Sequence, residues 1–196
     1  ALQREILATN DGLDMAAVAA HRVTTNVAYP WDQGSKALSA DELKRREAWQ
    51  SRFMPSGAMV AGRVDRLHWM TFGTPETLPL LYSEQPPLMT KGRQQAVVRV
   101  GAIQSDSDAT EAQTLNWSTA PRGTAVSVRM SGLLWPEAAA RIANSAYVTR
   151  ERVGKGQVIL FSGQPNFRGS TRGVGRVWLN ALVYGPGLGT SARVEL

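Results

Sequence analysis

The stretch AYVTRERVGKGQVILFSGQPNFRG, residues 146–169, gives the clearest indication of the fold. Its first half alternates, so one strand face would carry Val148, Arg150 and Arg152 while the residues between them point to the other face. The second half, QVILFSG, is apolar, and a Gly-Lys-Gly turn separates the two halves. The pattern predicts a β-hairpin with Lys155 exposed at its tip.

The Gly-Lys-Gly turn does not match a phosphate-binding loop. Such a loop has the pattern G-x-x-x-x-G-K-[ST] and leads directly into a helix, whose first backbone N–H groups help to bind the phosphates. Here Gln157 follows the turn, and an apolar strand pattern follows at once. We therefore expect the turn to be structural.

The rest of the chain predicts an α/β domain. Residues 1–53 are expected to be mainly helical with a loop. Residues 2–20 have helical spacing, and Ser39 and Glu42 form a capping-box pair at the start of the second helix. In residues 54–190, short apolar or alternating runs indicate strands, and these runs are AMVAGRVD, LPLLYS, QAVVRVG and TAVSVRMSG. Helices are expected at WPEAAARIANSA and GVGRVWLNALVYG. Because QVILFSG is apolar throughout, we expect it to lie inside a mostly parallel sheet flanked by helices.

Composition excludes several kinds of site. The chain has 196 residues, a net charge of +6 and no cysteine, which excludes disulfides, thiolate metal sites and a cysteine nucleophile. Its basic residues are scattered, so nucleic acid is not an expected partner, and no apolar run is long enough to span a membrane. His68 has Asp65 nearby but lies in no metal-binding or hydrolase motif. We expect a structural role for His68, and neither a metal nor a cofactor.

The best polar cluster is Asn166, Arg168 and Arg172 in QPNFRGSTRG. This segment follows a strand expected to be central, and loops after such strands bind ligands in open α/β sheets. In the alternative interpretation, Arg168 holds the loop in place through an ion pair and carbonyl hydrogen bonds. A third interpretation is an unrecognised enzyme site around Asn166, Arg168 and His68.

Residues 131–189 resemble the C-terminal end of large bacterial zinc carboxypeptidases of the carboxypeptidase A type. The shared pattern is a Ser-Gly and Pro-Glu helix, a Gly-Lys-Gly turn, an apolar strand, a Pro-x-Phe-Arg-Gly corner and a closing helix with Asn-Ala. These features stand here at Ser131-Gly132, Pro136-Glu137, Gly154-Lys155-Gly156, Pro165 to Gly169 and Asn180-Ala181. Residues 54–79 are similar to the stretch that precedes this region in the family.

The resemblance implies an accessory region with a fold like that of class I glutamine amidotransferases, whose first strands would precede Ala1. The family's zinc ligands, a His-x-x-Glu and a distant His, belong to the peptidase domain, and neither that motif nor the amidotransferase cysteine is in this sequence. Because the strand before Arg168 is expected inside the sheet, its loop should begin near the core, where a guanidinium needs a partner. The resemblance places the Pro-Glu and Phe-Arg-Gly features together, so we expect Glu137 and Arg168 to form a partly buried ion pair.

The function implied by this resemblance is that of a non-catalytic accessory domain. Its expected partner is the peptidase domain of the parent protein, with a peptide or a cell-envelope polymer as a further ligand. The expected location is secreted or periplasmic. The alternative function is a stand-alone binding module for an acidic polymer or glycan, which would use the scattered arginines.

Overall fold

The computed structural model describes residues 39–88, 90, 93–108, 113–115 and 118–188. The helix predicted in residues 2–20 lies outside these residues. The chain divides into two compact units after Arg46, and nearly all of the described elements belong to the second unit. In chain order the elements are α3 (Ala40–Ser51), β1 (Ser56–Val64), η1 (Trp69–Thr71), β2 (Thr77–Ser83), β3 (Gln95–Val100), β4 (Ala102–Ser105), β5 (Gln113–Leu115), β6 (Ser118–Ala120), β7 (Thr124–Ser127), β8 (Arg129–Ser131), α4 (Pro136–Ile142), β9 (Ala146–Val153), β10 (Gly156–Phe161), η2 (Phe167–Gly169) and α5 (Arg172–Leu188).

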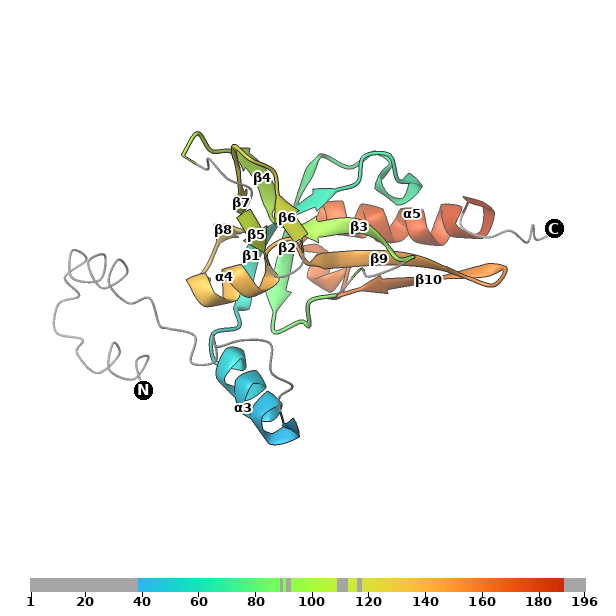
Figure 1. Cartoon of the computed structure of the whole chain (residues 1–196). Coiled ribbons are helices and arrows are strands. Elements are labelled where there is room, and N and C mark those ends of the chain that lie inside the picture. The colour runs from blue at the N-terminus through green and yellow to red at the C-terminus, as the bar shows by residue number, and fades with distance from the viewer. Residues whose placement is uncertain (1–38, 89, 91–92, 109–112, 116–117, 189–196) are drawn as a thin grey trace. The chain divides into compact units, whose positions relative to one another are not determined.

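The main sheet is antiparallel, so the predicted mostly parallel α/β sheet flanked by helices is wrong, and so is the glutamine amidotransferase-like fold that the resemblance implied. Its strand order is β10-β9-β3-β1-β2, with β8 also paired to β1, and the sheet curls into a half-barrel (Figure 1). Every strand pair in it is antiparallel. Parallel neighbours need crossover connections of a dozen or more residues, usually helical. Among the described residues α4 is the only α-helix between strands, so the chain lacks the connections that a parallel sheet requires.

The β9–β10 hairpin is confirmed. Val153 pairs with Gly156 across a two-residue turn, in which Gly154 has a φ of 58° and Lys155 is exposed. The prediction that QVILFSG lies inside the sheet is wrong, because β10 is an edge strand. Val158 and Leu160 are both exposed on it.

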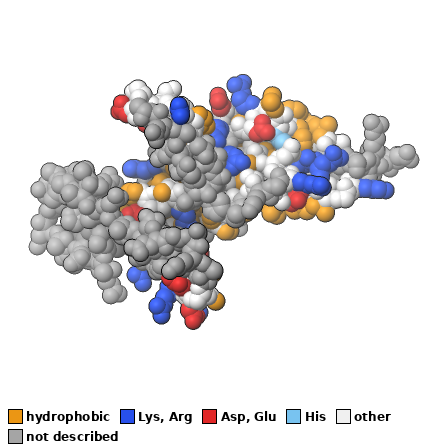
Figure 2. All heavy atoms as spheres, viewed as in Figure 1, with side chains coloured by type: hydrophobic (Ala, Val, Ile, Leu, Met, Phe, Trp, Pro, Cys, Tyr) orange, Lys and Arg blue, Asp and Glu red, His pale blue; other side chains and the backbone are white. Residues whose placement is uncertain are grey.

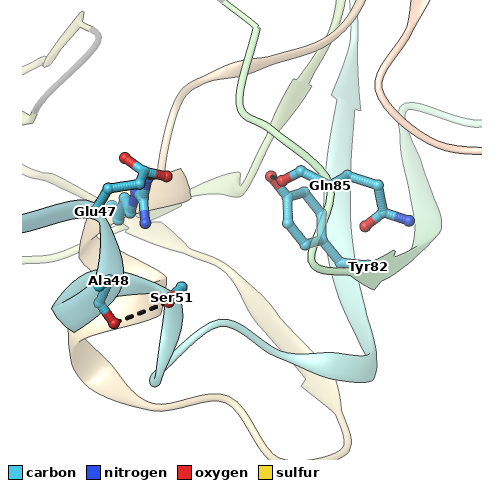
Figure 3. Close-up of polar contacts among 6 residues, drawn as sticks. Glu47, Ala48, Ser51, Tyr82 and Gln85 are labelled. Atoms are coloured by element: carbon cyan, nitrogen blue, oxygen red, sulfur yellow. Dashed lines mark hydrogen bonds and ion pairs between the residues drawn. The ribbon is translucent and has the colours of Figure 1, made fainter. Parts of the chain in front are cut away.

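The helix ends follow local hydrogen-bonding rules. The backbone N–H of Glu42 donates to Ser39 Oγ at 3.3 Å, which confirms the predicted start of α3. The helix ends at Ser51, whose hydroxyl donates to the Ala48 carbonyl at 2.9 Å (Figure 3). The predicted helix α4 begins at Pro136, where the missing backbone N–H has no helical partner to lose.

The core lies between the sheet and α5. Alternate residues of β2, namely Leu78, Leu80 and Tyr82, are fully buried. Gly173 lets α5 approach β2 closely, because a Cβ at that position would lie 2.5 Å from Leu78 Cδ2. The Tyr82 hydroxyl donates to the Gln85 carbonyl at 2.9 Å (Figure 3), and burial raises the pKa of Tyr82 to about 12, so the phenol stays neutral.

A side-chain amide joins α5 to the loop that carries η1. Asn180 is only 4% exposed, and its Nδ2 donates to the carbonyls of Met70 at 2.9 Å and Phe72 at 2.8 Å. Met70 itself is fully buried. One asparagine therefore satisfies two main-chain acceptors, one within η1 and one just after it, and sets where this loop lies against the helix.

Replacing Asn180 by Ala should lower the free energy of unfolding by about 1–3 kcal/mol, because it removes both donors from partly enclosed carbonyls. Urea unfolding followed by tryptophan fluorescence measures the change. The neighbouring Leu179→Ala variant alters an exposed side chain and should change stability by about 0.5 kcal/mol at most. Equal effects of the two substitutions would contradict the bridging role of Asn180.

Candidate functional sites

The predicted polar cluster lies in the segment that follows β10, the edge strand of the sheet. Asn166, Arg168 and Arg172 are all exposed in the structure. Arg168 has a φ of 49°, in the left-handed region, and its guanidinium carbon lies 5.2 Å from the centroid of the Phe167 ring. The corner follows an edge strand, so it does not begin near the core as the sequence interpretation required.

The predicted ion pair between Glu137 and Arg168 is absent. Arg168 is exposed and lies against its own neighbour, Phe167. Glu137 Oε2 is buried and makes no hydrogen bond. Since the physical reason for the pairing was a buried guanidinium, the exposure of Arg168 removes that reason.

Glu137→Ala and Arg168→Ala should therefore have additive effects on stability. We expect the double variant to equal the sum of the single variants within about 0.5 kcal/mol, as for sites that share no contact. A double-mutant cycle in urea measures this coupling. A coupling well above that value would show that the two charges interact.

A groove opens where α5 ends, beside the η1 loop. It has a volume of about 360 Å³ and is formed by the η1 loop, the start of β3, the last part of β9 and the end of α5. The residues that line it are Leu67, His68, Trp69, Phe72, Gln95, Arg150, Arg152 and Leu188. Figure 2 shows basic side chains beside hydrophobic ones toward the end of the molecule that carries the β9–β10 hairpin.

His68 is built into the wall of this groove. Its Nδ1 accepts a hydrogen bond from the Met70 N–H at 3.2 Å, which caps η1, and the residue is only 7% exposed. The imidazole lies 5.3 Å from the Trp69 ring at a tilted angle. The second ring nitrogen, Nε2, is buried and makes no hydrogen bond of normal geometry with a described group, although the Gln95 side chain interacts with the ring. The predicted structural role of His68 agrees with this cap.

The surroundings keep the His68 ring neutral. Burial lowers the pKa of His68 below its ordinary value of 6.5, and the positive charge of Arg150 lowers it further, while Asp65 and Gln95 oppose this shift. Because Nδ1 accepts a hydrogen bond, the proton of the neutral ring is assigned to Nε2. The ring is therefore a neutral N–H donor at pH 7.

The shifted pKa of His68 makes stability depend on pH. The unfolded chain binds the proton at a higher pH than the folded chain, so stability is complete above about pH 6.5 and falls as the pH drops below it. In His68→Asn, the Asn oxygen can still accept from Met70 N–H, but the group no longer titrates. Urea unfolding at several pH values should show a smaller loss for the variant than for the original chain. An identical pH dependence would contradict the lowered pKa.

Arg150 is held in place by two glutamines. Its Nε donates to Gln157 Oε1 at 2.9 Å and its Nη1 donates to Gln95 Oε1 at 3.0 Å. Gln157 in turn donates to the Gly185 carbonyl at 3.1 Å, in the last turn of α5. Arg152, two residues along the same strand face, is exposed. The network fixes one guanidinium at the groove and leaves a second guanidinium at its rim.

The structure separates His68 from the predicted corner. The groove includes Leu188 at the end of α5, whereas Arg168 precedes the first residue of that helix. A helix of 17 residues is about 25 Å long, so His68 and Arg168 lie toward opposite ends of it. The proposed joint site of Asn166, Arg168 and His68 is therefore not assembled.

Sequence reasoning did not identify the groove. The alternation in β9 correctly placed Arg150 and Arg152 on one face, which was the available signal.

In the part of the chain that the structure describes, no group of three or more His, Cys, Asp or Glu side chains could hold a metal ion. No helix within the same residues is long and apolar enough to cross a membrane. No family model, curated protein or solved structure matches the chain.

Proposed function

We propose that this chain is a non-catalytic accessory domain that packs on the peptidase domain of a bacterial zinc carboxypeptidase. The observation that carries the proposal is the outward face of α5. Leu179, Leu182 and Val183 are all exposed there, at the i, i+3, i+4 spacing of a single helix face. A helix surface of this kind is typical of contact with another protein domain.

The opposite side of α5 already packs on this domain. Val174, Val177 and Asn180 are buried there. From Val177 to Leu188 the helix has no charged residue, so its second half is apolar or uncharged all round. A helix that is hydrophobic on every side is normally buried on every side. In the described part of the chain, one side of α5 is buried against this domain.

The choice of partner rests on the resemblance of residues 131–189 to the region that accompanies the peptidase domain in that family. The helix, turn, strand, corner and closing helix of the shared pattern correspond in order to α4, the Gly154-Lys155 turn, β10, η2 and α5. The chain lacks the family's His-x-x-Glu motif, so the proposal assigns catalysis to the peptidase domain alone.

The test is binding of the 196-residue chain to the separately produced zinc carboxypeptidase domain of the same organism, measured by calorimetry. Leu182→Ser should weaken binding about tenfold or more, because it removes an apolar contact from the face of α5. The matched control is Leu160→Ser on β10, since Leu160 is 50% exposed and Leu182 is 55% exposed. The control should bind within about twofold of the original chain.

Undetectable binding of the original chain, or equal binding by both variants, would contradict the proposal. The alternative function, a binding module for an acidic polymer, predicts a different binding result. It would bind a polyanion such as polyglutamate, with an affinity that falls steeply as salt is added and that does not depend on Leu182.

A further inference from the structure

We propose that the groove beside His68 binds the carboxylate of a small organic acid that carries an apolar group. This site is separate from the outward face of α5, and the inference does not rest on the proposed packing function. It follows from the donors, the charges and the apolar walls that meet in the groove.

The candidate donors are the ring N–H of His68 and the guanidinium groups of Arg150 and Arg152. His68 lines the groove; its Nδ1 accepts from Met70, and its buried Nε2–H interacts with the Gln95 side chain but makes no hydrogen bond of normal geometry with a described group. Gln95 lies near the ring, but its Oε1 accepts from Arg150. A buried donor without an acceptor is unfavourable, so an oxygen ligand in the groove would complete the hydrogen bonding of the ring.

The charges favour an anion. Among the described residues that line the groove, Arg150 and Arg152 are basic and none is an Asp or Glu. The nearest acidic residue of the loop, Asp65, is exposed, and its Oδ1 accepts from the Leu67 N–H. Glu151 lies between the two arginines and so points to the other face of β9, where it accepts from Gln94.

The walls favour an apolar substituent on that anion. Leu67, Trp69, Phe72 and Leu188 supply hydrophobic surface around the polar groups. A volume of about 360 Å³ lies at the lower end of the range for small-molecule sites, which matches one ring or one amino-acid residue with its carboxylate. Arginine binds both carboxylate and phosphate. Because Arg150 already donates to Gln157 and Gln95 and the other walls are apolar, we infer the smaller charge of a carboxylate.

The source of the carboxylate could be a free small acid or the C-terminus of a peptide. Phenylacetate represents the first and N-acetyl-Gly-Phe represents the second. Their neutral amides, phenylacetamide and N-acetyl-Gly-Phe-amide, keep the apolar group and remove the charge. Binding of each compound to the full chain is measured by calorimetry, together with the 15N shift of His68 Nε2.

We expect at least one of the two acids to bind at least tenfold more tightly than its amide and to shift the His68 Nε2 resonance. His68→Asn keeps the cap on η1 and removes the Nε2 donor, and Arg152→Gln removes the charge at the rim. Each should weaken binding about tenfold, as for the loss of a hydrogen bond to a charged group. Arg176→Gln is the charge-matched control, because Arg176 is exposed on α5 well before the groove, and it should bind within about twofold.

Preferential binding of phenylacetate over the peptide would identify a small-acid site, and the reverse order would identify a peptide C-terminus. Either result supports the carboxylate. The inference is overturned if acids and amides bind equally, if neither acid binds, or if the His68 Nε2 shift does not change in the original chain. The last measurement needs no variant, so it remains decisive if a substitution impairs folding.

Discussion

The side chain of Asn180 is the contact on which the arrangement of the groove depends. Its amide donates to two carbonyls of the η1 segment, at 2.9 Å and 2.8 Å, and so fixes α5 against a short loop that has no strand partner of its own. Because His68 caps that same segment, the position of its ring follows from the contact. Gln157 on β10 donates to the Gly185 carbonyl of α5 and accepts from Arg150, so it holds the Arg150 side chain at the same groove.

Local features of the fold could be predicted from the sequence, and the arrangement of the strands could not. The β9–β10 hairpin, the exposed Lys155 and the helix that begins at Pro136 depend on residues that are neighbours in the chain, and all three are confirmed. The sheet order depends on which strands pair at long range. QVILFSG was interpreted as a covered strand because it is apolar, yet Val158 and Leu160 are exposed on a sheet edge.

The same limit explains the candidate sites. Asn166, Arg168 and Arg172 were grouped because they are close in sequence, and the structure leaves them on the surface. The groove brings His68 and Arg150 together from segments about eighty residues apart, through the pairing of β3 with β9 and the packing of α5 on η1. No pattern within a single segment reports that kind of contact. Which ring nitrogen of a buried histidine has a hydrogen-bond partner can be seen only in the folded structure.

The two sides of α5 differ in burial. Its inner side is buried at Val174, Val177, Asn180 and Gly185, and its outer side presents leucines and a valine that the described residues leave exposed. Hydrogen exchange of the Asn180 side-chain amide, followed by NMR, tests the central claim most directly. If both Nδ2 protons are held by Met70 and Phe72, they should exchange much more slowly than those of the exposed Asn166. Exchange of the two amides at the same rate would contradict the bridge from α5 to η1.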